Sequence, residues 1–295
     1  MLSVLIPVYN YNIFSLVKIL HKQISDCDIP FEIICLDDAS QEFTIENQRI
    51  NQFTNSTFSI LEKNIGRSAI RNLLAQKAIY ENLLFLDADT IPVHENFIAN
   101  YLAALKKNLK VVFGGILYEN KKPSKEFLLR WIYGQKREAL SLAQRNTDPS
   151  NAALVSNLLI QKEIVLGFPF DQSITQYGYE DLLFFAVLKS NDIEIKHIEN
   201  PVFHLNLETS IVFLSKTKTA LETLCTLDDS NKISNNQSKI IASFETLKRV
   251  KLVSLFIFFF KKLKSKIERN LVSENPSLFL FDIYKLGYFS SLKSR

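Results

Sequence analysis

Two aspartates end the most apolar strand-like run in the chain. Residues 82–92 read NLLFLDADTIP, so mostly apolar residues lead into Asp87, Ala88 and Asp89. Carboxylates this close repel each other and are unstable beside an apolar strand unless a cation lies between them. Mg²⁺ and Mn²⁺ prefer oxygen ligands and leave positions open for substrate phosphates. The pair therefore predicts a divalent metal site, with a polar turn that only ends the strand as the alternative.

Acids and arginines near two other expected strand ends suit a nucleotide. Asp37 and Asp38 follow the run FEIICL (31–36). A carboxylate there can accept a nucleobase imide N–H or hold a ribose hydroxyl, or it can cap a helix instead. Arg67 and Arg71 lie four residues apart in NIGRSAIRN (64–72), at the opening of an expected helix. Such cations bind a diphosphate at a helix N-terminus, although a single arginine is more often a solvated surface residue.

Two later segments carry further candidates. Glu180 and Asp181 precede an apolar helix in GYEDLLFF (178–185), and His204 lies in PVFHLN (201–206). An acid beside a desolvated hydroxyl can act as a general base, but a helix N-terminus also favours acids for electrostatic reasons. A neutral imidazole can complete a metal shell that a carboxylate begins, but a lone histidine is more often structural. The residues alone leave both assignments open.

Alternating strands and helices are expected to position these groups. Strand-length apolar runs alternate with helically spaced apolar residues, which predicts an α/β fold with a parallel sheet between two helical layers. Ligands of such sheets bind beyond the carboxyl ends of the strands, so one edge should collect the polar side chains. The expected strands are 3–8, 31–36, 58–61, 82–86 and 111–118, and the expected helices are 12–24, 66–79, 94–107 and 125–144.

The C-terminal part differs in charge. Residues 246–295 hold eleven Lys and Arg against three Asp and Glu, a net charge of +8, whereas the whole 295-residue chain carries +4. We expect a catalytic domain over 1–210 and a basic helical extension over 211–295. A nucleic-acid partner would depend on the extension alone, and none is expected. Lysines flank an apolar stripe at 248–269, which predicts either peripheral contact with a membrane surface or packing on the catalytic domain.

The location is expected to be cytoplasmic. Three cysteines show neither an even framework nor metal-binding spacing, which favours a reducing compartment. SVLIPV at 3–8 follows no basic leader or cleavage site, and the longest apolar run, 252–260, is too short to span a bilayer. We therefore expect neither a signal peptide nor a spanning helix, with the inner face of the membrane as the place of any lipid contact.

Together the motifs resemble the family 2 glycosyltransferases with the GT-A fold. SVLIPVYN, LDDAS, NIGRSAIRN, FLDAD, GFPFD with GYED, and a late VFH occur in the family's order over roughly residues 1–206. The resemblance implies a Rossmann-like, mostly parallel central sheet and transfer with inversion from a nucleotide-sugar, first of all a UDP-sugar. The acceptor would be a glycan or a lipid-linked saccharide, the cofactor Mn²⁺ or Mg²⁺, and the setting bacterial polysaccharide, lipopolysaccharide or capsule assembly.

The resemblance also implies the residues that bind the donor. Asp37 and Asp38 would contact the nucleoside, and Arg67 or Arg71 would lie near the diphosphate. The other residues it assigns to the nucleotide-sugar are Pro7, Tyr9, Asn10, Asp87 and Ala88.

The resemblance implies metal binding and catalysis for a second set of residues. Asp87 and Asp89 would form the metal-binding pair, with Asp89 the closer ligand. His204 resembles a histidine that members similar to chondroitin polymerase add to the metal shell. Asp181 would be the general base, and Glu180 would bind the acceptor.

The chain departs from the family pattern at two places. Ala39 stands where the family usually has the glycine of Asp-Asp-Gly-Ser. Gly178 and Tyr179 precede the Glu-Asp pair, where Trp-Gly or Gly-Gly is frequent, so stacking on the acceptor is expected to differ.

Two other functions remain open from the sequence. FLDADTIP also resembles the signature of haloacid-dehalogenase-type phosphatases, in which Asp87 would be the nucleophile and Asp89 a general acid. That signature normally lies on the first strand, whereas about 80 residues of expected β-α units precede it here, and the matching downstream acidic motif is missing from the sequence. The second alternative is a nucleotide-sugar-binding protein without catalysis.

Overall fold

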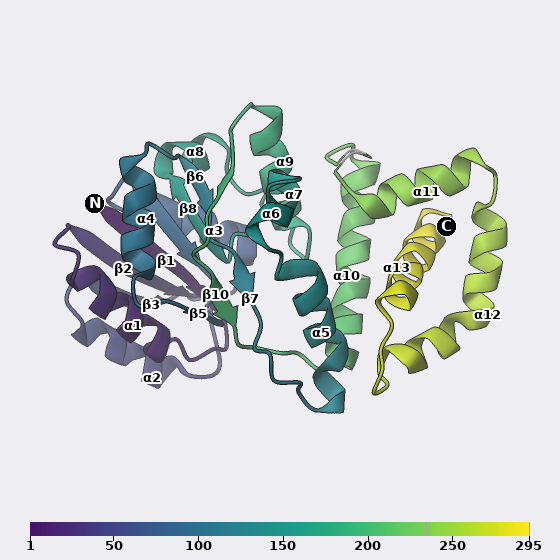
Figure 1. Cartoon of the computed structure of the whole chain (residues 1–295), viewed down its shortest axis with the longest axis horizontal. Helices are drawn as coiled ribbons and strands as arrows, with labels where there is room; N and C mark the ends of the chain where they lie inside the picture. Colours follow the sequence, from purple (N-terminus) through teal and green to yellow (C-terminus); the bar gives the residue numbers. More distant parts are fainter. Residues whose placement is uncertain (234, 236, 295) are drawn as a thin grey trace. The chain divides into compact units, whose positions relative to one another are not determined.

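The computed structural model describes residues 1–233, 235 and 237–294, and contacts divide the chain into two compact units (Figure 1). Unit 1 comprises residues 1–119, 138–175 and 187–206, and unit 2 comprises 120–137, 176–186 and 207–295. Two segments expected in the catalytic domain, 120–137 and 176–186, therefore belong by their contacts to unit 2. The domain boundary at residue 210 stays a prediction.

A seven-stranded sheet forms the centre of unit 1. Its strand order is β3-β2-β1-β4-β8-β6-β9. Three neighbouring pairs are parallel: β3 with β2, β2 with β1, and β1 with β4. Strand β8 is antiparallel to both β4 and β6. This confirms the predicted α/β class with a mostly parallel sheet. The strands are β1 (Leu2–Val8), β2 (Phe31–Asp37), β3 (Ser56–Ile60), β4 (Asn82–Leu86), β6 (Val111–Phe113), β8 (Asn157–Gln161) and β9 (Lys196–His197).

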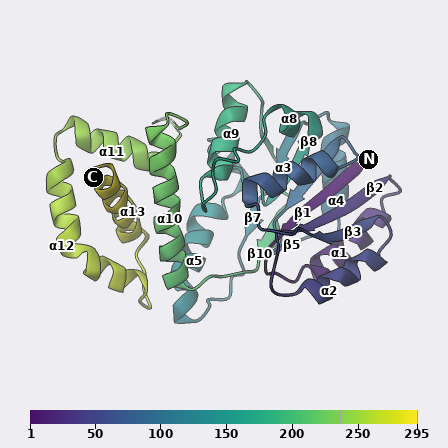
Figure 2. The same ribbon diagram turned by 180° about the vertical axis from the view of Figure 1, so that it is seen from behind.

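Helices cover both faces of this sheet (Figures 1 and 2). Leu2, Val4 and Ile6 of β1 are buried in one cluster with apolar residues of α1 and α4, while α3 lies on the opposite face. Burial on both faces explains why these strands are nearly continuous apolar runs. The helices of unit 1 are α1 (Phe14–Ser25), α2 (Thr44–Gln48), the 3₁₀ helix η1 (Arg49–Gln52), α3 (Arg67–Lys77), α4 (Phe97–Lys106), α6 (Leu142–Arg145), α7 (Pro149–Ala152) and α8 (Lys162–Gly167).

A second, three-stranded sheet has the order β5-β10-β7. Its strands are β5 (Thr90–Pro92), β7 (Ile116–Leu117) and β10 (Val202–His204). The predicted strand 111–118 is therefore wrong as one element, because β6 ends at Phe113 and β7 begins at Ile116. Gly115 between them has φ +100°, a left-handed conformation that glycine adopts readily. The chain thus passes from the main sheet into the small one.

Unit 2 is helical. The predicted helix 125–144 is interrupted: a π-helix follows α5, and the pairing of Ser141 with Gln144 in a capping box starts α6 separately. The unit's core includes Leu129, Phe213 and Tyr284. Among the described residues, no helix combines the length and apolarity needed to cross a bilayer. Its elements are η2 (Lys125–Phe127), α5 (Leu128–Tyr133), η3 (Gly134–Glu138, which ends in unit 1), α9 (Glu180–Ser190, which also ends there), α10 (Ser210–Asp229), α11 (Lys239–Arg249), α12 (Val253–Leu271) and α13 (Leu278–Lys293).

Candidate active site

The carboxyl ends of β1, β2 and β4 lie at one edge of the main sheet, because these neighbouring strands are parallel. Asn10 follows β1, Asp37 ends β2, and Asp87 follows β4. The edge predicted from the sequence to collect polar groups therefore exists in unit 1. It is the position at which open α/β sheets bind ligands.

Asp87 is held by two arginines of α3. Its Oδ1 lies 3.1 Å from Nη2 of Arg71, and its Oδ2 lies 3.6 Å from Nη2 of Arg67. Arg71 is 1% exposed, whereas the side chain of Arg67 is 52% exposed. Burial raises the pKa of the Asp87 carboxyl, but Arg71 and then Arg67 outweigh burial, so this pKa lies below its ordinary value. Asp87 is therefore a fixed anion with a buried and an accessible cation beside it.

Asp89 lies beside His204. The distance from Asp89 Oδ2 to His204 Nε2 is 3.4 Å. Strand pairing produces this contact, since β10 is antiparallel to β5 and His204 pairs with Thr90, the residue after Asp89. Burial raises the pKa of Asp89 above its ordinary value, the nearby imidazole opposes the increase, and Asp87 adds to it. The two residues that the sequence placed 115 positions apart are thus brought together.

These groups fit a divalent cation. A carboxylate oxygen and an imidazole nitrogen are suitable ligands for Mn²⁺. Asp89, directly before β5, presents the first, and His204, at the end of β10, presents the second. Nδ1 of His204 is buried and finds no hydrogen-bond partner among the described residues. No group of three or more His, Cys, Asp and Glu side chains in the described ranges is arranged as a metal site. Mg²⁺-type sites often have one or two protein carboxylates, with water and substrate phosphates as the other ligands.

Asp37 and Asp38 have different surroundings. Both carboxylate oxygens of Asp38 accept backbone N–H groups, from Ile65 at 2.7 Å and Gly66 at 3.0 Å. Asp38 thereby fixes the loop that leads into Arg67. Oδ1 of Asp37 accepts the N–H of Ser40 at 2.7 Å, while its buried Oδ2 has no hydrogen-bond partner among the described residues. A spare acceptor is therefore present at Asp37.

The loop after β1 is held against the loop after β2. The backbone N–H of Asn10 donates to Ser40 Oγ at 2.7 Å, and Asn10 Oδ1 accepts the N–H of Gln41 at 2.8 Å. Tyr9, next to Asn10, is 55% exposed. Ala39 has φ +61°, a conformation in which glycine carries less strain, which explains why the family usually has glycine there.

The remaining predicted contacts flank these residues. Pro7 lies within β1, where it is half-buried, and Ala88 packs against the apolar core of unit 1 between the two acids of the pair. Neither side chain can form a hydrogen bond, so any donor contact would be by packing or through the backbone.

Glu180 and Asp181 start α9 and belong to unit 2. Glu180 is 6% exposed, and its Oε2 accepts the N–H of Gly178 at 3.1 Å. Gly178 and Tyr179 have φ of +102° and +67°, and a Cβ on Gly178 would lie 2.5 Å from Cβ of Ala220. Glycine is therefore required immediately before Tyr179. Asp181, the predicted base, is half-buried in the first turn.

The sequence did not reveal the residues that support His204. The ring of Tyr118 stacks on the imidazole with centroids 5.3 Å apart, and Tyr118 Oη donates to Glu138 Oε2. Tyr118 is 3% exposed and directly follows β7, which pairs with β10. Pairing of short strands far apart in the chain produces this contact, so a local pattern could not have shown it.

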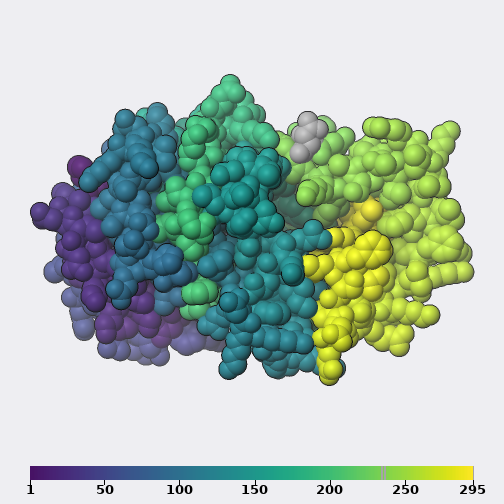
Figure 3. All heavy atoms as spheres, in the orientation of Figure 1, coloured from purple at the N-terminus to yellow at the C-terminus, as the bar shows by residue number. Residues whose placement is uncertain are grey.

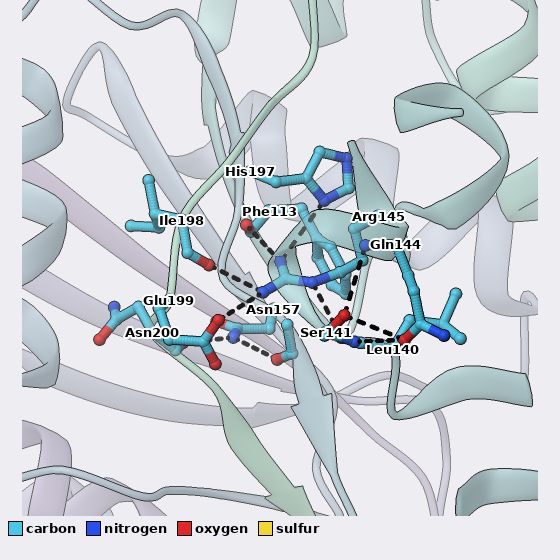
Figure 4. A network of polar contacts seen from close by, with 11 residues as sticks. Phe113, Leu140, Ser141, Gln144, Arg145, Asn157, His197, Ile198, Glu199 and Asn200 are labelled. Atoms are coloured by element: carbon cyan, nitrogen blue, oxygen red, sulfur yellow. Dashed lines mark hydrogen bonds and ion pairs between the residues drawn. The ribbon is translucent and has the colours of Figure 1, made fainter. Parts of the chain in front are cut away.

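A buried arginine holds the two chain segments where they leave the main sheet. Arg145 is 1% exposed, and its guanidinium donates to the carbonyls of Ile198 (3.1 Å) and Phe113 (3.4 Å) and pairs with Glu199 Oε2 at 3.3 Å (Figure 4). It also lies 3.4 Å from Nδ1 of His197, whose Nε2 donates to a backbone carbonyl. Burial lowers the pKa of Arg145, and Glu199 opposes that change. The network joins the segments that continue into β7 and β10.

The family follows from a match to the first half of the chain. The model of the family described as Glycosyl transferase family 2 matches residues 3–157, more than half of the 295 residues. The chain therefore belongs to glycosyl transferase family 2 and is a glycosyltransferase. This decides against the phosphatase alternative. No curated protein matches the chain significantly.

Similar solved structures show the same GT-A fold. S. aureus TarS is 21% identical with a TM-score of 0.51, over 74% of this chain and 38% of that longer chain. TarS 1–349 is 17% identical with a TM-score of 0.52, over 99% and 90% of the two chains, and it has also been solved with UDP-GlcNAc. Glucosyl-3-phosphoglycerate synthase from Mycobacterium tuberculosis, solved with Mg²⁺ and UDP, is 15% identical with a TM-score of 0.52, over 77% and 78%. At these identities the likeness concerns the fold.

Proposed function

We propose that this protein transfers a sugar from a nucleotide-sugar to an acceptor hydroxyl, with inversion of the anomeric centre. The proposed donor is a UDP-sugar, and the proposed cofactor is Mn²⁺ or Mg²⁺. The observation that carries the proposal is the pairing of Asp89 with His204 at 3.4 Å, next to Asp87 and its arginines. The solved relatives that bind UDP with Mg²⁺, or UDP-GlcNAc, support this choice of donor.

In this proposal each donor-binding residue has its own task. Asp37 offers its spare Oδ2 to a nucleobase N–H, and Asp38 holds the loop before Arg67. Arg67 faces the diphosphate, while Arg71 keeps Asp87 ionised and in place. The other proposed contacts to the nucleotide-sugar are Pro7, Tyr9, Asn10, Asp87 and Ala88.

The chemistry follows from the charges. When bound by Asp89 and His204, with Asp87 nearby, the divalent cation supplies positive charge opposite the leaving nucleoside diphosphate. Arg67 adds a cation from the N-terminus of α3. Asp181 takes the proton of the acceptor hydroxyl as its oxygen attacks the anomeric carbon opposite the breaking bond to the diphosphate, which inverts the configuration. Glu180 binds the acceptor.

The acceptor is proposed to be a glycan or a lipid-linked saccharide. Residues 119–150, rich in aromatic and basic side chains, would shape the acceptor pocket. The protein would work in the cytoplasm, in polysaccharide assembly in a bacterium, with residues 248–269 at the inner face of the membrane.

The test is a panel of UDP-, GDP- and dTDP-sugars with Mn²⁺. We expect slow hydrolysis of one donor, its loss with EDTA, and a Mn²⁺-dependent increase of the melting temperature with the matching nucleoside diphosphate. Asp89→Asn should lower kcat/KM by at least about 100-fold and abolish the metal-dependent shift, because a carboxylate ligand is lost.

Glu163→Gln is the matched control. Glu163 is an exposed acid beyond β8, at the opposite edge of the sheet, so hydrolysis and the thermal shift should not change. Hydrolysis that persists with EDTA would disprove the metal requirement. A wild-type protein that binds nucleotide but hydrolyses no donor, with or without acceptors, would favour the non-catalytic alternative.

A further inference from the structure

Helix α12 of unit 2 has two apolar faces, and only one of them packs inside the unit. Ile257, Phe260 and Ile267 are buried, and the ring of Phe260 fits against Gly287 of α13, where a Cβ would lie 2.3 Å from it. In both ribbon views α13 lies between α10 and α12, which leaves the other side of α12 at the edge of unit 2 (Figures 1 and 2). The core of the unit thus accounts for one face.

The outer face of α12 carries exposed aromatic and aliphatic side chains. Leu255, Phe258, Phe259 and Leu263 are 46–52% exposed. Their spacing of three and four residues puts them on one stripe of the helix. In the space-filling view, side chains of this part of the chain form the outer surface of unit 2 (Figure 3). An exposed apolar stripe of this kind marks an interaction surface.

The same stripe becomes basic in the second half of the helix. Lys262, Lys266 and Arg269 continue it toward the C-terminus, and Nζ of Lys262 lies 4.3 Å from the centroid of the Phe258 ring. Residues 248–269 contain eight Lys and Arg and a single acid, Glu268. Glu268 is engaged with Tyr284 and Lys218, so it does not neutralise the outer face.

We propose that the outer face of α12, defined as Leu255, Phe258, Phe259, Lys262, Leu263, Lys266 and Arg269, binds the surface of an anionic phospholipid bilayer. The apolar half would enter the headgroup region, and the basic half would contact lipid phosphates, as in interfacial helices. Charge argues against a second copy of the chain, because a symmetric interface would place each basic half against the partner's basic or apolar half, with no acidic residue of this stripe to pair with it. The inference extends the membrane contact of the proposed function but does not depend on catalysis.

Sedimentation of the full chain with vesicles tests the proposal. We expect binding to phosphatidylcholine vesicles that contain phosphatidylglycerol, little binding to phosphatidylcholine alone, and release by high salt. The double variant Phe258→Ser, Phe259→Ser should weaken binding on the order of 10-fold or more, because it removes the apolar insertion. Lys262→Glu with Lys266→Glu should weaken it at least as much and reduce the salt dependence.

Two variants serve as controls. Ile211→Ser removes an apolar side chain that is 71% exposed on α10, and Lys18→Glu reverses an exposed charge on α1; neither should change vesicle binding. Equal binding to both vesicle types, or no loss in either double variant, would overturn the proposal. If the wild-type protein is a dimer without lipid and the double Phe variant is a monomer, the outer face of α12 binds a second copy of the chain instead. Hydrolysis of a nucleotide-sugar without vesicles tests the proposed function separately.

Discussion

Two buried arginines of unit 1 differ from one exposed arginine of unit 2. In unit 1, Arg71 and Arg145 are each 1% exposed, and each guanidinium contacts a carboxylate. In unit 2, Arg137 pairs with Asp282 at 2.7 Å, but each side chain is 46% exposed. A buried charge must have its partners in place, whereas an exposed one is also satisfied by water. Burial therefore makes Arg71 and Arg145 fix geometry, whereas exposure leaves Arg137 replaceable.

The proposed site residues are also divided between the two units. Those proposed for the donor and the metal belong to unit 1, and Glu180 and Asp181 belong to unit 2. Variants in unit 1 should therefore act on donor and metal binding, whereas variants of the Glu-Asp pair should act on the chemical step. Measuring donor binding and turnover separately distinguishes the two.

The largest effect is expected for Asp181→Asn. Loss of a general base typically costs roughly 10²–10⁴-fold in rate. We expect kcat for transfer to fall by that factor, while the Mn²⁺-dependent thermal shift with nucleoside diphosphate stays at its wild-type value. Asp192→Asn, an exposed acid after the same helix, is the control and should leave both quantities unchanged. Loss of the nucleotide-dependent thermal shift in Asp181→Asn would contradict the assignment of donor binding to unit 1 and of the chemical step to the Glu-Asp pair.

Arg145→Met should have the next largest effect, on stability. Methionine removes the guanidinium donors from the carbonyls of Ile198 and Phe113. The Phe113 carbonyl keeps the N–H of Ile198, whereas the part-buried Ile198 carbonyl loses its donor, and an unsatisfied buried acceptor costs about 1–3 kcal/mol. We expect the free energy of unfolding to fall by about 2–4 kcal/mol in urea titrations with an unchanged slope.

Glu199→Gln separates the two roles of Arg145. The Glu199 side chain is 60% exposed, so loss of its charge should cost less than about 1 kcal/mol. If Glu199→Gln were as damaging as Arg145→Met, the ion pair rather than the buried carbonyl contacts would hold the network, and the comparison would lose its basis.

The sequence predicted the main sheet well because its signals are local. The apolar runs that lead into Asp37 and Asp87 are buried strands, and their parallel order places both acids at one edge. The sequence also identified Arg71, but a spacing of four residues could not show that Arg71 is buried and Arg67 exposed. That difference depends on which side of α3 packs on the sheet.

Features that depend on distant contacts were not predictable. The run VVFGGILY (111–118) has the pattern of a single strand, yet it divides at Gly114. A Cβ on Gly114 would lie 2.4 Å from Tyr101 Oη and from the carbonyl oxygen of Asn200. Both neighbours come from other parts of the chain. The stacking of Tyr118 on His204 arises in the same way, since it requires the small sheet that this division creates.

Arg137→Met should have the smallest effect, and it is the closest counterpart of Arg145→Met because the same substitution is made eight residues away. The Arg137–Asp282 pair has good geometry, but both side chains remain in contact with water, so its attraction is screened and opposed by the entropy of ordering two long side chains. We expect a loss of about 0.2–1 kcal/mol in urea titrations, smaller still at high salt. A loss comparable to that of Arg145→Met would show that exposure does not decide the contribution of an arginine in this protein.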